Sequence, residues 1–263
     1  MKRNQFFLFG SRDIFSPLLI YYVVIMVAMY AAGFFVGTGD EWYNLRKIIG
    51  AIITIPFLYL LYFKPDRELF PEKKIKILSL RTLKYAVITI FVATIMGIGV
   101  NNLTVLVFPV DKSEGFAQAN QALFGSALVF QILNSVVITP FLEEMLYRGI
   151  IFGRLQRMLS GWLAVVLSGV IFGFMHFNMV QFIYASAIGM VLALLVRISG
   201  HFWTAVLGHM SANLIAIFRN RFDFLGGTLA HAWWSYLLAV GLIAVGGVLL
   251  LLFYKSEVTK DGM

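Results

Sequence analysis

Two adjacent acids stand inside an apolar stretch in the second half of the sequence. Glu143 and Glu144 belong to the run TPFLEEMLYRGIIFG. On a helix, Glu144 and Arg148 are four residues apart and share a face, so they can form an ion pair. Glu143 points about 100° away from Glu144. We therefore expect Arg148 to neutralise Glu144 and Glu143 to stay available for chemistry. The alternative is an interfacial helix end where both acids meet water.

A second polar group follows in the run FGFMH, where His176 stands at the end of an apolar helix. Phe172 lies one turn earlier on the same helix face. In a catalytic interpretation, Phe172 shields the site from water and fixes the imidazole of His176. In a structural interpretation, His176 is a helix-end residue whose ring reaches the membrane surface or is satisfied locally.

The third group is His209 and Asn213 in the run GHMSANLIAIF. The two residues are four apart, so their side chains face the same way on a helix. Both can donate hydrogen bonds, and two neutral donors aimed at one point suit a developing oxyanion. The alternative is a hydrogen-bonding pair that holds two membrane helices together.

Taken together, the three groups place polar residues at helical spacing on three successive segments. An ionisable group inside a membrane span costs roughly 2.5–3.5 kcal/mol, so such residues are expected to have a function. A carboxylate base, a histidine and a pair of donors can activate a water and stabilise the tetrahedral intermediate of amide hydrolysis. The remaining histidines, His201 and His231, are interpreted as membrane-interface residues.

The elements that must position these residues are membrane helices. The chain has 263 residues, of which 60% are hydrophobic and 13% charged, whereas a soluble domain carries about 25% charged residues. A membrane helix needs roughly 20 apolar residues, and we expect an all-α, polytopic membrane helix bundle with about eight transmembrane helices. One expected span lies inside 117–155, and the others are approximately 16–37, 48–63, 85–108, 161–177, 180–198, 202–218 and 233–254.

The stretch 117–155 has a helical pattern but is too long for one upright span. It is either an interfacial segment that turns into a membrane helix, or one tilted helix with a kink at Pro140. We see no internal repeat and no room for a soluble domain. We therefore expect one integral membrane domain over 1–263, with the chemistry concentrated at about 117–220.

The net charge of +8 comes from basic residues that cluster in a few short segments. The N-terminus, the loop 64–84, Arg154 with Arg157, and the tail alternate correctly for one side under the positive-inside rule. Both termini are therefore expected in the cytoplasm of a multi-pass protein of the cell membrane. Arg219 and Arg221 fall on the opposite side and are a weak contrary signal.

Two classes of partner and chemistry are not expected. The sequence has no soluble basic face with interleaved aromatic residues, so nucleic-acid binding is not expected. It has no cysteine, which excludes disulfides, thiolate metal sites and a cysteine nucleophile. The expected partners are the lipid bilayer and a peptide or membrane-protein substrate.

The three motifs resemble those of the CAAX-protease and bacteriocin-processing family, also called the Abi family. EEMLYR is similar to its EExxxR motif, FGFMH to its FxxxH motif and HMSAN to its HxxxN-type motif, in the family's order over about 140–218. The resemblance implies a metal-free, glutamate-dependent intramembrane endopeptidase with an eight-helix core. By this resemblance Glu143 activates water, His176 is its partner, His209 and Asn213 stabilise the oxyanion, and Glu144, Arg148 and Phe172 support the site.

Three alternatives remain open at this point. Glu143, His176 and His209 could instead supply three ligands to zinc, although no HExxH pair is present. Buried Glu, His and Arg could form the proton relay of a transporter, but all the polar groups lie in one half of the chain, without the expected repeats. A non-catalytic membrane scaffold or bacteriocin-immunity protein is the main alternative to a peptidase.

Overall fold

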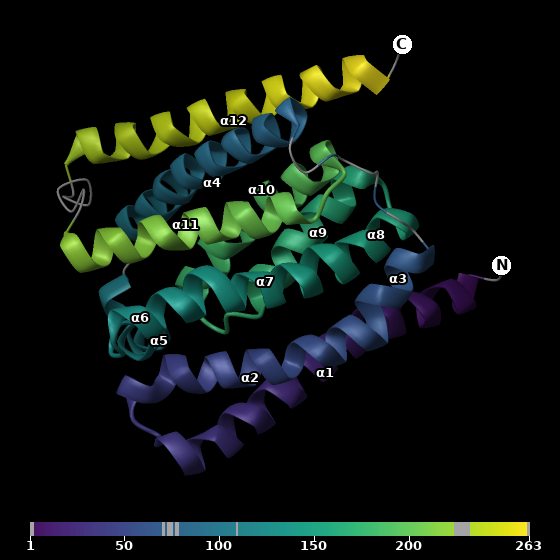
Figure 1. The fold of residues 1–263 in the computed structure, drawn as a ribbon. Coiled ribbons are helices and arrows are strands. Elements are labelled where there is room, and N and C mark those ends of the chain that lie inside the picture. Colours follow the sequence, from purple (N-terminus) through teal and green to yellow (C-terminus); the bar gives the residue numbers. More distant parts are fainter. Residues whose placement is uncertain are drawn as a thin grey trace. The chain divides into compact units, whose positions relative to one another are not determined.

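The described elements of this computed structural model are all helices. It describes residues 3–69, 72, 76, 79–108, 110–223 and 232–261, and Figure 1 shows their course. His231, interpreted above as an interface residue, lies outside the described residues. The helices are α1 Arg3–Val36, α2 Tyr43–Leu58, α3 Lys64–Leu69, α4 Leu80–Val107, α5 Glu114–Phe124, α6 Leu128–Ile132, α7 Thr139–Glu144, α8 Gly153–Met158, α9 Gly161–Phe174, α10 Met179–Ser199, α11 Trp203–Phe222 and α12 Trp233–Asp261.

The expected polytopic helix bundle is confirmed, and the count of about eight spans is approximate. Within the described residues, six stretches are long and apolar enough to cross a membrane: Asp13–Val36, Asp40–Leu69, Leu80–Val107, Leu128–Met158, Met179–Ser199 and Trp233–Glu257. α9 is apolar but shorter, with 14 residues. α11 has 20 residues, and His209, Ser211 and Asn213 lower its hydropathy.

The stretch 117–155 forms two helices and not one tilted helix. α5 ends at Phe124, and the residues Gly125 to Ala127 separate it from the long helical stretch Leu128–Met158. The Ser126 hydroxyl donates to the backbone oxygen of Asp40 at 3.1 Å, and the Gln131 amide donates to the backbone oxygen of Ser126 at 2.6 Å. The bond from Gln131 satisfies a backbone carbonyl where the helix is interrupted, and the bond from Ser126 ties this point to the turn before α2.

The long stretch Leu128–Met158 contains two π-helical segments, Leu133–Ile138 and Met145–Phe152. Pro140 lies directly after the first segment, at the start of α7. A proline inside an α-helix has no N–H and its ring clashes with the carbonyl four residues earlier. A wider π-helical turn just before Pro140 accommodates both defects, and such turns occur often at functional sites.

The chain folds into two compact units, each assembled from two separate segments. Unit 1 comprises Met1–Glu72 and Gln121–Ser168, and unit 2 comprises Lys73–Asn120 and Gly169–Met263. The expectation of one membrane domain over 1–263 stays a prediction.

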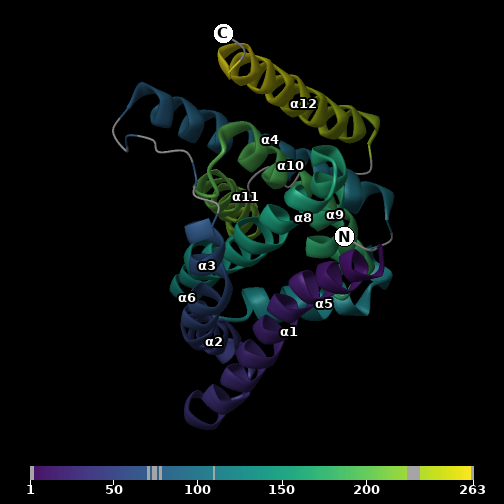
Figure 2. The same cartoon turned by 90° about the vertical axis from the view of Figure 1, so that its right-hand side faces the viewer.

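In unit 1, α1 packs along α2 (Figures 1 and 2), and α2 contacts the long stretch that carries Glu143. A chain of buried amides ties these helices together. The Asn134 amide donates to the side-chain oxygen of Asn44 at 2.6 Å, and the Thr139 hydroxyl donates to the side-chain oxygen of Asn134 at 2.6 Å. Hydrogen bonds of this kind fix helix contacts where no water is available.

In unit 2, α4 contacts α10, α11 and α12, and α10 contacts α11. α9 approaches α10 through glycines at a spacing of four. A Cβ atom on Gly169 would lie 2.7 Å from the backbone oxygen of Ser186, and one on Gly173 would lie 2.5 Å from the backbone oxygen of Phe182. Only glycine allows this approach, which follows the small-xxx-small pattern of membrane helices.

The turn between α10 and α11 places His201 in the interior of unit 2. Gly200 ends α10 with φ of 76°, a left-handed conformation that glycine adopts without a steric cost. His201 is 5% exposed, and its ring stacks on Trp203 at 6.3 Å with an interplanar angle of 25°. Tertiary packing thus covers His201 at the start of α11, and its position at the membrane interface stays a prediction.

Candidate active site

Glu143 is the accessible residue in a buried segment. From Leu142 to Phe152, every residue is buried except Glu143, which is half-buried. Glu143 and Glu144 end α7, and the π-helical segment begins at Met145. The segment packs closely, since a Cβ atom on Gly149 would lie 2.5 Å from Cε2 of Phe63. The two acids therefore have different environments although they are adjacent.

Glu144 and Arg148 form the expected ion pair. Arg148 Nη1 donates to Glu144 Oε1 at 2.9 Å, and both side chains are 0% exposed. The Arg148 guanidinium also lies 5.9 Å from the centroid of the Tyr147 ring. Two charges out of water are tolerated only when they are paired closely, and removing one partner leaves a buried charge uncompensated. The geometry thus assigns Glu144 to Arg148, as the sequence predicted.

Glu143 has neighbours that the sequence did not reveal. It interacts electrostatically with Tyr21, Tyr22 and Tyr147 and with Lys47 of α2. The hydroxyls of Tyr22 and Tyr147 are 3.4 Å apart, and either can donate. The electrostatic surroundings of Glu143 thus include phenols and an ammonium from α1, α2 and the motif segment. Lys47 lies just before the predicted span 48–63, and nothing in the local sequence connected it to Glu143.

The backbone defines the tautomer of His176. The carbonyl oxygen of Phe172 lies 3.0 Å from Nδ1 of His176. A carbonyl oxygen only accepts, so Nδ1 carries the proton, and in the neutral ring the lone pair is on Nε2. The side chain is half-buried. His176 therefore presents a basic nitrogen on the side of the ring away from its own helix.

The turn after His176 is held by Asn178. The Asn178 amide donates to the backbone oxygen of His176 at 3.1 Å. Its side-chain oxygen accepts from the backbone N–H of Gln181 at 2.9 Å, which caps α10. Between them, Phe177 has φ of 57°, an uncommon conformation for an aromatic residue. One asparagine thus orders both the end of the α9 motif and the start of the next helix.

Phe172 joins two of the predicted histidines. Its buried ring meets the His176 ring edge to face, with centroids 5.1 Å apart and an interplanar angle of 82°. It meets the His209 ring in the same way, at 5.6 Å and 86°. Edge-to-face contacts are the favoured geometry of aromatic rings. The second and third motifs therefore come together within unit 2 around the Phe172 side chain.

Asn213 lies on the same continuous helix as His209, one turn later, and is half-buried. His209 itself is 6% exposed. Gly208 lets α11 pack closely, since a Cβ atom there would lie 2.9 Å from Cδ2 of Leu192. The helix geometry needed for two donors on one face is present.

The predicted residues thus fall into two clusters. Unit 1 holds Glu143, Glu144 and Arg148, and unit 2 holds Phe172, His176, His209 and Asn213. That both clusters act on one substrate stays a prediction. Among the residues that the structure describes, no group of three or more His, Cys, Asp or Glu side chains is placed to hold a metal ion.

Comparison with known proteins covers this same region. Residues 125–215 match the family model of the type II CAAX prenyl endopeptidase Rce1-like proteins. A protein of Bacillus subtilis strain 168 named "Putative membrane peptidase YdiL" is 30% identical over 91 residues, which are 35% of this chain and 37% of that protein. No solved structure matches. The seven motif residues all lie inside the matched region, and over residues 125–215 the chain is similar to the Rce1-like type II CAAX prenyl endopeptidases.

Proposed function

We propose that this protein is a membrane-embedded endopeptidase that hydrolyses a peptide bond with a water activated by Glu143. The observation that carries the proposal is the contrast between the two acids. Glu144 is fully buried against Arg148, whereas Glu143 is half-buried in a segment that is otherwise buried. A carboxylate that acts on water needs an accessible surface, and within 142–152 Glu143 is the acid that keeps one.

The proposed reaction needs no covalent intermediate with the enzyme. Glu143 takes a proton from water, and the hydroxide attacks the carbonyl carbon of the scissile amide. His209 and Asn213 donate hydrogen bonds to the oxyanion of the tetrahedral intermediate. The carbon–nitrogen bond then breaks, and the leaving amine takes the proton from Glu143. Water and one peptide give two peptides, and the carboxylate returns to its starting state.

His176 assists this step through Nε2. With Nδ1–H donated to the Phe172 carbonyl, Nε2 is the nitrogen that can accept a hydrogen bond from the attacking water. Phe172 holds that ring and the His209 ring in a fixed relation. The support for these roles is the tautomer and the packing, together with the motif resemblance.

The proposed substrate is a membrane-associated peptide. The matched family is described as CAAX prenyl endopeptidases, and the bacterial relative carries only the name of a membrane peptidase. A prenylated C-terminal peptide is therefore the first substrate to offer, beside peptides from membrane-protein termini. The Tyr22 and Tyr147 hydroxyls near Glu143 are additional donors for such a substrate.

The test compares purified wild type with Glu143→Gln in detergent, using both peptide classes and mass spectrometry of the products. Glu143→Gln keeps the shape of the side chain but not its basicity, and should lower cleavage about 10²–10⁴-fold. Glu41→Gln, an exposed acid in unit 1, is the matched control and should cleave as wild type does. Undiminished cleavage by Glu143→Gln would exclude the glutamate mechanism.

Two further arms separate the alternatives. Loss of wild-type cleavage with a chelator, and its return with zinc, would favour a zinc enzyme. If neither peptide class is cleaved by wild type, the cellular phenotype of Glu143→Gln decides: an unchanged phenotype would indicate the non-catalytic scaffold.

A further inference from the structure

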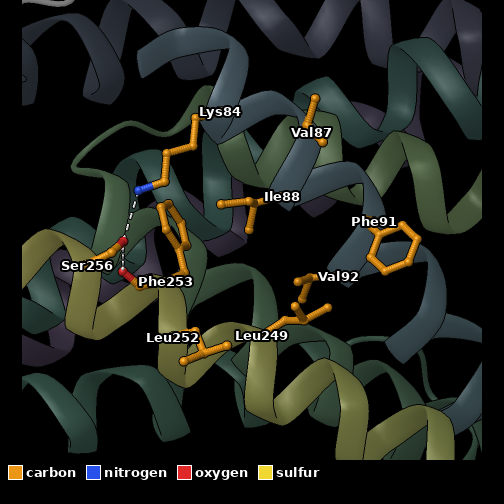
Figure 3. Close-up of a pocket in the computed structure, with 9 residues that line it drawn as sticks. All are labelled: Lys84, Val87, Ile88, Phe91, Val92, Leu249, Leu252, Phe253 and Ser256. Atoms are coloured by element: carbon orange, nitrogen blue, oxygen red, sulfur yellow. Dashed lines mark hydrogen bonds between the residues drawn. The ribbon is translucent and has the colours of Figure 1, made fainter. Parts of the chain in front are cut away.

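A groove runs between α4 and α12 within unit 2, with apolar walls and one polar end (Figure 3). Its volume is about 330 Å³. Ile88 and Val92 of α4 and Leu249 and Phe253 of α12 line the apolar part. Lys84 and Ser256 lie together at one end, where the Lys84 ammonium donates to the Ser256 hydroxyl at 2.9 Å.

The groove opens toward the surroundings of the two membrane helices. Three of its lining residues are more than half exposed: Val87 at 57%, Phe91 at 56% and Leu252 at 57%. Both helices belong to stretches able to cross a membrane. The hydrocarbon region of a bilayer holds essentially no water, so a groove at that depth is filled by a hydrocarbon chain.

The polar end keeps a positive charge after its internal pairing. Glu257 has a side chain only 6% exposed and is the acceptor of this cluster. Its Oε1 accepts from Lys84 at 2.9 Å, and its Oε2 accepts from Arg81 at 3.0 Å and from the Tyr85 hydroxyl at 2.6 Å. Among the side chains of this cluster that the structure describes, two cations face one carboxylate, which leaves one positive charge.

Both cations remain within reach of a ligand. The side chain of Arg81 is 49% exposed and that of Lys84 is 34% exposed. An ammonium has three donors and a guanidinium five, so each has donors beyond those used within the cluster. Phosphate oxygens suit such donors, and basic residues at a helix end favour anionic lipids.

We propose that this groove binds one anionic phospholipid. One acyl chain lies along Ile88, Val92 and Leu249, and the phosphate is bound by Lys84 and Arg81. The groove joins an apolar part to a cationic end, as an amphiphile joins an apolar chain to a charged headgroup. A free anion would contact only the cationic end, and a neutral hydrocarbon only the apolar part. This lipid would brace α4 against α12 at the end where Glu257 joins them.

The test uses the full-length protein after delipidation in detergent, with native mass spectrometry as the readout. Phosphatidylglycerol and phosphatidylcholine with identical chains are added in equal amounts. Wild type should retain the anionic lipid about fivefold more than the zwitterionic one, as expected for one lysine at a headgroup. Lys84→Gln should bring the ratio close to one, whereas Lys84→Arg should keep it.

Two matched controls keep the result interpretable. Lys64→Gln makes the same charge change at an exposed lysine of unit 1 and should leave the ratio unchanged. Ile88→Trp fills the groove without changing the charges and should reduce retention of both lipids at least several-fold. Ile90→Trp, on the same helix but outside the groove and 42% exposed, should not.

Specific results would overturn the proposal. Equal retention of the two lipids by wild type would remove the role of the cations. Unchanged retention in Ile88→Trp would remove the role of the groove, and this variant serves even if Lys84→Gln does not fold. Displacement of the phospholipid by millimolar inorganic phosphate would indicate a simple anion site.

Discussion

Phe172 and His209 belong to different helices, yet their rings meet edge to face with centroids 5.6 Å apart. The first comes from the end of α9 and the second from the middle of α11. The contact makes the aromatic residue of one motif a structural support for the histidine of another. It also gives the second-motif phenylalanine a supporting role that can be tested by substitution.

Phe172→Leu should keep the fold and lower turnover. Leucine retains most of the buried volume, but it lacks the aromatic edge that meets both imidazoles. A small displacement of positioned groups costs up to about 10²-fold in rate. We expect kcat to fall about tenfold or more with little change in KM for the peptide. Wild-type kcat in Phe172→Leu would show that packing bulk alone is required.

Glu144→Gln should destabilise the protein strongly. The substitution leaves the Arg148 guanidinium buried without its counter-charge, which typically costs about 3–5 kcal/mol. Glu68→Gln is the matched control, since Lys64 and Glu68 also form an i,i+4 pair at 3.8 Å but with mostly exposed side chains. Exposed pairs contribute at most about 1 kcal/mol. Denaturant unfolding in detergent measures the free energy of unfolding of both variants. A similar small decrease in Glu144→Gln and Glu68→Gln would contradict the prediction.

Gly173→Ala should damage both packing and activity. The added Cβ would meet the backbone of α10, 2.5 Å from the oxygen of Phe182 and 2.7 Å from the nitrogen of Ser186. The backbone cannot move aside as a side chain can, so α9 must shift and carry Phe172 and His176 with it. Gly247→Ala on α12 is the control, because nothing lies within 4 Å of its added Cβ.

The Gly247→Ala control has an expected direction of its own. Alanine favours a helix over glycine by about 1 kcal/mol, so this variant should be neutral or slightly more stable than wild type. Thermal unfolding of the two variants in the same detergent gives the comparison. Equal stability of Gly173→Ala and Gly247→Ala would show that the α9–α10 approach is not as close as described.

Substitutions of Asn178 can separate its capping of α10 from its support of the His176 backbone. Asn178→Asp keeps the acceptor for the N–H of Gln181 but loses the donor to the His176 carbonyl. We expect its thermal stability to stay near that of wild type while kcat falls. Asn178→Ala loses these two bonds and also the bond from the Asn178 amide to the side-chain oxygen of Gln181, and it should lower stability by about 1 kcal/mol. Full activity in Asn178→Asp would mean that the His176 carbonyl needs no support.

The orientation of the protein in the membrane can be measured by labelling single introduced cysteines, because the native sequence has no cysteine. Thr38→Cys, Lys64→Cys and Glu114→Cys introduce thiols at exposed positions. With both termini in the cytoplasm, an impermeant maleimide added outside cells should label positions 38 and 114 but not 64. Arg154 Nε donates to Asp66 at 2.8 Å, so labelling at 64 also reports the side of Arg154. Labelling at position 64 alone would mean that both termini lie outside the cytoplasm, the opposite of the predicted orientation.

Local patterns in the sequence predicted what depends on local geometry. The Glu144–Arg148 pair follows from helical spacing, and the spans follow from runs of apolar residues. A helix break inside 117–155 was one of two alternatives, and the length of the stretch did not locate it at Gly125 and Ser126. The motifs also marked Phe172 as a residue that fixes His176, and the ring contact and the Nδ1 hydrogen bond are both present.

Other features depend on contacts between distant segments. Tyr21 and Tyr22 of the first helix interact electrostatically with Glu143, and no local pattern pairs a phenol with that acid. The π-helical turns leave no mark in hydrophobic periodicity, because they change the hydrogen-bond register within a uniformly buried segment. The burial of His201 depends on the packing of Tyr85 and Trp203 around it, which hydropathy cannot show.

Neither compact unit is synthesised as one continuous segment, so each must wait for its second segment before it can fold completely. Unit 1 and unit 2 alternate along the sequence. α4 therefore leaves the ribosome before the second half of unit 1 and well before α10, α11 and α12, its partners in unit 2. Arg81 and Lys84 meet Glu257 only once the last helix has been made. During translation, the basic end of α4 therefore exists without the carboxylate that pairs with it in the folded protein.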